Sequence, residues 1–80
     1  MTVDTREVSN ADFKQHLNFF RHLQHQVDAN PLRLTLKNES VVEGRIASIG
    51  GNFVEIETFP EKFVIELFVD VKQLEYVSNF

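Results

Sequence analysis

The fold of this chain is decided by residues 32–46, which read LRLTLKNESVVEGRI. The first part of this stretch alternates leucine with a polar residue, and this period of two predicts a strand with one buried face. A turn is predicted over 38–40, where Asn, Glu and Ser interrupt the alternation. In the next strand Val42, Gly44 and Ile46 share one face, and a glycine inside a strand allows the sharp bend by which a short sheet curls toward closure.

Three further strands are predicted downstream, at residues 53–57, 63–69 and 73–77. The Gly-Gly-Asn sequence at 50–52 indicates a tight hairpin before the first of them. The Phe-Pro-Glu-Lys sequence at 59–62 separates the next two. Five short consecutive strands joined by brief turns are typical of a small antiparallel barrel, which we expect to span about residues 32–77.

Upstream of these strands, the sequence predicts an amphipathic helix over about residues 10–28. Its apolar residues recur at spacings of three and four, the period of one helix face, and are Phe13, Leu17, Phe20, Leu23 and Val27. Ser9 or Asn10 can cap the N-terminus of the helix. Pro31 ends the helical segment, because a proline moves the residue before it out of helical space. Residues 1–8 lack such a pattern and are predicted to form a flexible N-terminal arm.

The composition is that of a single small domain, predicted over residues 9–80 of the 80-residue chain. Without cysteine, neither disulfides nor thiolate metal sites can stabilise it, so a good core or self-association must do so. No window approaches the ~18 apolar residues of a membrane span, and the N-terminus lacks the apolar run of a signal peptide. We therefore expect a cytoplasmic protein with no membrane association. The net charge of −4 argues against strong nonspecific binding to nucleic acid.

From Pro31 onward the layout resembles the Sm-like proteins and, among them, the bacterial Hfq branch. The resemblance rests on the alternating leucines before Asn38 and on the Val42-x-Gly44-x-Ile46 pattern, within a match over roughly residues 31–77. It implies a mainly β fold with an N-terminal α-helix and a small, strongly bent, five-stranded antiparallel barrel of Sm-like type. Members of this family assemble into homo-oligomeric rings, in which strand four of one subunit pairs with strand five of the next.

The residues with which the family binds RNA are replaced in this chain. Gly50 stands where the family has the aspartate that opens its RNA-binding loop, and Asn52 stands where an aromatic ring would stack on a base. Glu39 replaces the glycine of the first turn, and residues 67–69 read Leu-Phe-Val in place of Tyr-Lys-His or Ile-Arg-Gly. A site for single-stranded RNA requires stacking rings, polar groups for base edges and cations for phosphates. The resemblance therefore implies the fold but not the uridine pocket.

A relocated or weak RNA site is an alternative that the sequence leaves open. Its candidate contact residues are Asn52, Phe53, Arg33, Lys37 and Arg45. The three basic residues can align across the outer face of the first two strands, although acidic residues nearby dilute their charge. Because no aromatic rings are interleaved with them, an ordinary solvated face is the competing interpretation, and we expect any RNA binding to be weak.

The histidines are the obvious candidates for metal or acid–base chemistry. His22 and His25 share the polar helix face at a spacing of three, which suits a metal, but no third or fourth ligand is spaced to complete a site. His16 borders the apolar stripe, where packing is the simpler interpretation. Glu55 and Glu57 alternate with apolar residues, which is typical of a solvated strand face. The sequence therefore predicts no catalytic residue, no metal and no cofactor.

The strand predicted at 63–69 has apolar residues on both faces, unlike a strand with one solvated face. Phe63, Ile65 and Leu67 are assigned to the barrel interior, and the opposite face is assigned to a second subunit. The predicted oligomer interface consists of Val64, Glu66, Phe68, Leu74, Tyr76 and Val77. Exposed apolar edge strands invite pairing with another chain. The alternative is that the helix or the C-terminal tail covers this surface within one subunit.

Together these patterns predict a non-enzymatic protein that forms a homo-oligomeric, Sm-like ring and acts as an assembly or protein-interaction platform. An RNA-binding Sm-like protein is the second hypothesis. An enzyme or metal protein centred on the histidines is the third. The sequence identifies neither a protein partner nor the number of subunits.

Overall fold

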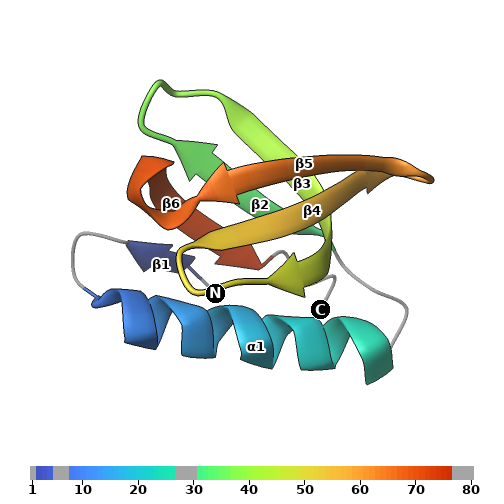
Figure 1. Cartoon of the computed structure of the whole chain (residues 1–80), viewed down its shortest axis with the longest axis horizontal. Coiled ribbons are helices and arrows are strands. Elements are labelled where there is room, and N and C mark those ends of the chain that lie inside the picture. Colours follow the sequence, from blue (N-terminus) through green and yellow to red (C-terminus); the bar gives the residue numbers. More distant parts are fainter. Residues whose placement is uncertain (1, 5–7, 27–30, 77–80) are drawn as a thin grey trace.

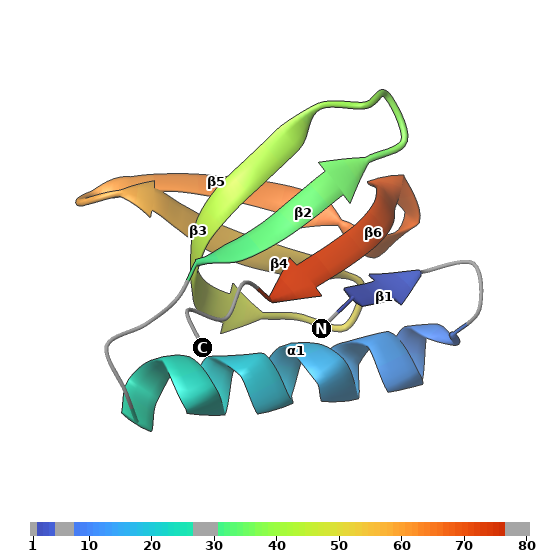
Figure 2. The same cartoon turned by 180° about the vertical axis from the view of Figure 1, so that it is seen from behind.

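The computed structural model describes residues 2–4, 8–26 and 31–76. In chain order its elements are β1 (Thr2–Asp4), α1 (Asn10–Gln26), β2 (Leu32–Leu36), β3 (Val41–Ile49), β4 (Phe53–Phe59), β5 (Lys62–Leu67), a 3-10 helix (Phe68–Asp70) and β6 (Val71–Tyr76). Figure 1 shows α1 along one side of a strongly curved sheet, and Figure 2 shows the same arrangement from behind. The predicted mainly β class, with a helix followed by five antiparallel strands, is confirmed.

Helix α1 begins where the sequence predicts a cap. The backbone N–H of Asp12 donates to the hydroxyl oxygen of Ser9 at 3.1 Å, which provides a partner for one of the N–H groups that a helix leaves unpaired at its start. The first three members of the predicted apolar stripe are buried against the sheet, whereas Val27 lies outside the described residues. Within the described ranges, no helix combines the length and the apolar character that crossing a bilayer requires.

The strands form one antiparallel sheet in the order β1-β6-β2-β3-β4-β5. Strands β2 to β5 pair with their neighbours along the chain, and β6 returns to pair with β2. Among the described residues no pairing joins the two end strands, β1 and β5, so the sheet is open and the predicted barrel is not formed. The edge of β6 that would have to meet β5 in a closed barrel pairs with β1 instead.

Strand β1 is not predicted by the sequence, because residues 1–8 lack a periodic pattern and suggest a flexible arm. It pairs antiparallel with β6 in the register Thr2↔Glu75, Val3↔Leu74 and Asp4↔Gln73. A strand of three residues is too short to show an alternation of its own. Its formation depends on the backbone ladder that β6 offers, which lies at the far end of the sequence.

Gly44, where the sequence predicts a bend, lies within β3, the strand between β2 and β4 in the sheet (Figure 1). Strand β3 pairs with β2 up to Gly44 and with β4 from Arg45 onward. A Cβ atom at position 44 would lie 2.2 Å from the carbonyl oxygen of Glu57, a backbone atom that cannot move aside cheaply. The glycine therefore allows β4 to approach the backbone of β3 closely.

A buried glutamine connects α1 to the same part of β3. Past the Leu32↔Gly44 pair, β2 no longer runs beside β3. There the side-chain oxygen of Gln24 accepts from the N–H of Ile46 at 3.0 Å, and its side-chain nitrogen donates to the carbonyl of Gly44 at 3.4 Å. Because both partners are backbone groups of β3, the side-chain amide takes the place of a neighbouring strand.

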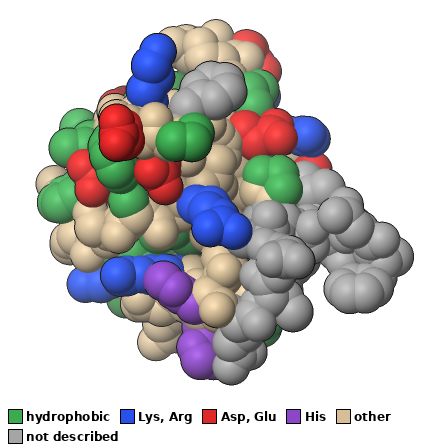
Figure 3. Space-filling model, turned by 90° about the vertical axis from the view of Figure 1, so that its right-hand side faces the viewer, with side chains coloured by type: hydrophobic (Ala, Val, Ile, Leu, Met, Phe, Trp, Pro, Cys, Tyr) green, Lys and Arg blue, Asp and Glu red, His purple; other side chains and the backbone are tan. Residues whose placement is uncertain are grey.

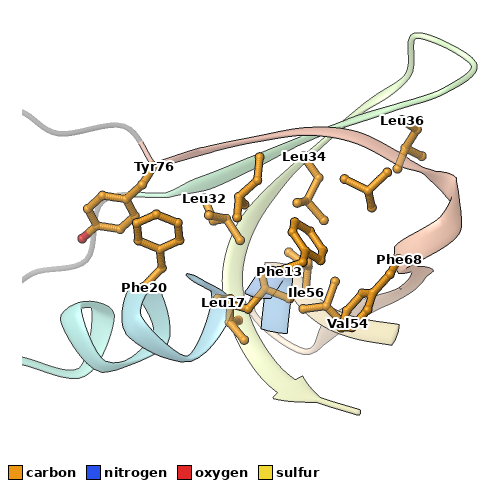
Figure 4. Close-up of a cluster of buried hydrophobic side chains, with 13 residues drawn as sticks. Phe13, Leu17, Phe20, Leu32, Leu34, Leu36, Val54, Ile56, Phe68 and Tyr76 are labelled. Carbon is orange, nitrogen blue, oxygen red and sulfur yellow. The ribbon is translucent and has the colours of Figure 1, made fainter. Parts of the chain in front are cut away.

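The hydrophobic core fills the space between α1 and the inner face of the sheet (Figure 4). Two aromatic pairs join the helix to the C-terminal part of the chain. Phe13 packs edge-on against Phe68, and Phe20 stacks on Tyr76, with ring centroids 5.0 Å apart in each pair. The other buried strand residues are Leu32, Leu34, Leu36, Ile46, Val54, Ile56, Val71 and Leu74. This core defines which face of each strand points inward.

Two turns place a glutamate in the left-handed backbone region, with φ of 70° at Glu39 and 68° at Glu61. The turn at Glu39 is closed by its N–H, which donates to the carbonyl of Leu36 at 2.9 Å. Its carboxylate contacts the ammonium of Lys72 at 2.8 Å. A residue with a Cβ is disfavoured in this region by roughly 1–2 kcal/mol relative to right-handed backbone. Position 39 thus keeps a conformation that glycine prefers, although the residue is glutamate.

Candidate self-association surface

Strand β5 forms one end of the sheet. It pairs with β4 in a register that runs from Phe53↔Leu67 to Phe59↔Lys62. Among the described residues, no strand pairs with its other edge, which we call the outer edge of β5. On and just after this strand, four apolar side chains are between 43% and 64% exposed, namely Phe63, Ile65, Leu67 and Val69. We call these four residues the β5 surface.

The register with β4 decides which face of β5 is exposed. Ile56 of β4 is buried in the core and pairs with Val64, and Val54 is likewise buried and pairs with Glu66. Paired residues point to the same side of a sheet, and successive residues point to opposite sides. Val64 and Glu66 therefore face inward, and the β5 residues between them face outward.

An acidic row on β4 borders the β5 surface. Glu55 and Glu57 stand opposite Ile65 and Phe63 in the β4–β5 register. Glu55 accepts a hydrogen bond from the hydroxyl of Ser48 at 3.2 Å, and Glu57 accepts one from a backbone N–H in the following turn at 3.2 Å. The outer face of the sheet is thus apolar at its edge and acidic one strand further in.

The structure corrects the face of β5 that the sequence assigns to the oligomer interface. Three of the six predicted residues, Phe68, Leu74 and Tyr76, are buried in the core of one subunit. Val64 and Glu66 are half-buried on the inner face, and Val77 lies outside the described residues. The physical reason is that the strand predicted at 63–69 carries apolar residues on both faces. A period of two separates the two faces of a strand, but it does not show which of them is inside.

The neighbouring strand explains why the exposed residues could not be found from the sequence. The sequence pattern assigns Phe63, Ile65 and Leu67 to the interior and does not assign Val69 to the interface. Strand β4 alternates unambiguously, with valine and isoleucine between glutamates, and only two residues, Pro60 and Glu61, separate it from β5. Counting outward from this turn without a bulge would pair Ile56 with Ile65 and turn Ile65 inward. The register instead shifts between Glu57 and Phe59, so that Ile56 pairs with Val64, and this irregularity reverses the two faces of β5.

The basic candidates for RNA contact are partly neutralised. The guanidinium of Arg33 lies between two carboxylates, with its Nε 3.1 Å from Glu43 and its Nη1 3.2 Å from Glu75. Lys37 and Arg45 are exposed. Arg45 stands opposite an acidic residue of β4 in the β3–β4 register. This face therefore carries mixed charge, as the competing interpretation of the sequence expected.

The other two RNA candidates, Asn52 and Phe53, lie beyond the opposite end of β3. That end is about 20 Å along the strand from Glu43, at roughly 3.3 Å per residue. The carbonyl of Asn52 accepts from the N–H of Phe68 at 2.8 Å. The half-buried ring of Phe53 lies against Gly50, where a Cβ would come within 2.1 Å of a ring carbon. The structure therefore does not bring the candidate stacking ring and the Arg33 side chain together.

Of the three histidines, His16 is half-buried and stacks on Phe20 with ring centroids 6.4 Å apart, which confirms the packing prediction. His22 and His25 are exposed. Figure 3 shows histidine side chains beside basic ones on one face of the molecule. In the part of the chain that the structure describes, no three His, Asp or Glu side chains gather closely enough to hold a metal ion.

No family model, curated protein or solved structure matches this chain. The functional interpretation therefore rests on the fold and on the β5 surface. The chemistry that this surface offers is that of a sheet edge. Backbone N–H and C=O groups along an edge can extend the ladder with another strand, while the apolar side chains are removed from water.

Proposed function

We propose that this protein is a non-enzymatic, Sm-like module that self-associates through the outer edge of β5 and acts as an assembly or protein-interaction platform. The observation that carries the proposal is the β5 surface, where four apolar side chains at a sheet edge are 43% to 64% exposed. The resemblance of residues 31–77 to the Sm-like proteins supports it as well, because that family assembles through strand edges.

An edge strand of this kind is open to pairing with another chain. Monomeric proteins protect edge strands with charged residues, proline, bulges or short length. Strand β5 is six residues long and contains no proline. Its outward positions from Phe63 to Leu67 carry no charge, and its glutamate points inward. Pairing with another strand would hydrogen-bond the backbone of β5 and bury its apolar side chains.

The partner edge that suits β5 is β6 of a second copy. Both strands are six residues long. In the antiparallel register that overlaps all of these residues, Val64 stands opposite Leu74, and both side chains belong to the inner face. The same register sets Glu66 opposite Lys72, which places opposite charges across the contact. Because the two edges differ, the contact is heterologous, and its repetition closes a ring if the rotation permits.

Light scattering over a series of protein concentrations tests the proposal. The wild-type mass is expected to rise above that of one 9.3 kDa chain. Phe63→Glu is expected to reduce the mass to one chain, because it places a carboxylate opposite Glu57 of β4 and, in the proposed register, opposite Glu75 of the second copy. Phe19→Glu is the matched control, because Phe19 lies on α1 and is 54% exposed, the same as Phe63.

Two outcomes would overturn the proposal. One is a wild-type mass that stays at one chain at every concentration. The other is an assembly that Phe63→Glu leaves unchanged, which would place the contact elsewhere. Loss of assembly in the Phe19→Glu control would also contradict the proposal, since it would assign the contact to the helix. Phe68→Glu does not serve this purpose, because Phe68 belongs to the core.

A further inference from the structure

We infer that β1 is a built-in competitor for the strand edge through which the proposed assembly forms. In the single chain β1 occupies the edge of β6, and it must leave before β5 of a second copy can pair there. The inference rests on the proposed function, and it adds a mechanism by which the same chain controls its own assembly.

The geometry makes the two partners mutually exclusive. A strand has two edges, and β2 takes one edge of β6 through a register that runs from Leu32↔Tyr76 to Leu36↔Val71. The other edge pairs with Thr2–Asp4. An incoming β5 and the resident β1 therefore require the same N–H and C=O groups of β6.

The two competitors differ in length and in side chains. β1 has three residues and covers positions 73–75 of β6. β5 has six residues, as many as β6 itself, and carries the exposed apolar side chains of the β5 surface. Once docked, β5 offers the longer ladder and buries more apolar area.

The tether gives β1 the advantage when the protein is dilute. β1 belongs to the same chain as β6, so its local concentration does not fall with dilution, whereas that of a second copy does. The single chain with its β6 edge covered therefore prevails at low concentration. A second copy displaces β1 as the concentration rises. The device raises the concentration that assembly requires by a constant factor, and it protects the β6 edge of the isolated chain from unrelated strands.

An opened variant and a locked variant test the inference in the full-length chain. Successive N–H groups of a strand point to opposite edges, so one of Val3 and Asp4 directs its N–H toward β6. Val3→Pro/Asp4→Pro therefore removes that donor without changing the rest of the sheet. We expect it to associate about tenfold more tightly than wild type, because the loss of one or two net hydrogen bonds in the competing strand shifts an equilibrium by roughly that factor.

The locked variant is Asp4→Cys/Gln73→Cys. These two residues are paired neighbours in the β1–β6 register, a spacing that suits a disulfide, and the chain has no other cysteine. Oxidised, the variant is expected to have the mass of one chain. On reduction, the same sample is expected to return to the wild-type distribution, so that each preparation serves as its own control. Circular dichroism verifies that both variants are folded.

The outcomes distinguish competition by β1 for the β6 edge, which we call the gate, from self-association itself. If the opened, wild-type and oxidised locked chains associate equally through the β5 surface, the gate is wrong and the proposed function stands. If the wild-type chain stays at the mass of one chain at every concentration, self-association itself is refuted, and the gate is refuted with it. A covalent dimer of the locked variant on a non-reducing gel would show that β1 fills the β6 edge of another copy, which contradicts a gate within one chain.

Discussion

Replacing Glu39 with glycine is expected to stabilise the folded chain by about 0.5–1 kcal/mol. The backbone at this position has φ of 70°, where a residue with a Cβ is disfavoured by roughly 1–2 kcal/mol and glycine is not. Two losses oppose this gain. Glycine increases the conformational entropy of the unfolded chain, at a cost of roughly 0.5 kcal/mol or more. The ion pair with Lys72 is also lost, but both side chains are well exposed, so it contributes only about 0–0.5 kcal/mol.

Urea denaturation and thermal melting, followed by circular dichroism, provide the measurement. About 1 kcal/mol corresponds to a Tm shift of roughly 4–8 °C for a domain of this size. Glu39→Ala is the matched control, since it removes the same carboxylate but keeps the Cβ. We expect Glu39→Gly to be more stable than wild type, and wild type to be at least as stable as Glu39→Ala. A glycine variant no more stable than the alanine variant would refute the reasoning. Glu61, at φ of 68°, allows an independent repeat of the test.

Three further predictions concern the interior. Gln24→Leu removes the side-chain acceptor of the buried Ile46 N–H and is expected to lower the free energy of unfolding by about 1–3 kcal/mol. Gln15→Leu on the exposed helix face should change it by less than about 0.5 kcal/mol. Equal effects of the two substitutions in urea denaturation would contradict the bridging role. Gly44→Ala should destabilise by roughly 1–3 kcal/mol or more, because its Cβ meets backbone. Gly51→Ala, with nothing within 4 Å of the added atom, should melt close to wild type, and a similar loss in both would argue against the close strand approach. Phe68→Glu should lower the free energy of unfolding by more than about 3 kcal/mol, since it removes a buried ring and buries a charge. A melting temperature near that of wild type would show that this residue lies at the surface.

The parts of the fold that could be predicted from the sequence are those with a clear local period. The apolar stripe that begins at Phe13 identifies the helix and its buried face, and the alternating leucines of β2 identify a strand together with its inner side. In both cases polar residues fill the opposite face, so the pattern also gives the orientation. Gly44 can be identified for the same reason, because the alternation on either side of it places it inside a strand.

The remaining features depend on contacts between distant parts of the chain. The orientation of β5 depends on its register with β4 and on the shift in that register, since apolar residues such as Val64 and Ile65 lie on both of its faces. Strand β1 forms on the edge that β6 provides, and three residues carry no periodic signal. Gln24 lies on a helix face between apolar neighbours, and nothing in its local sequence indicates that it hydrogen-bonds a strand. Whether a curved sheet closes depends on which strands occupy its ends, which is not a local property.

The hydrogen bond between Gln24 and Ile46 also affects how the molecule opens. Amide exchange with solvent requires that an N–H lose its partner, and the partner of this N–H is supplied by α1, not by another strand. Any fluctuation that lifts the helix from the sheet must therefore expose the Ile46 amide, even if every strand pairing is retained. Exchange at this one position reports the undocking of α1, whereas exchange at amides paired between strands reports the opening of the sheet itself.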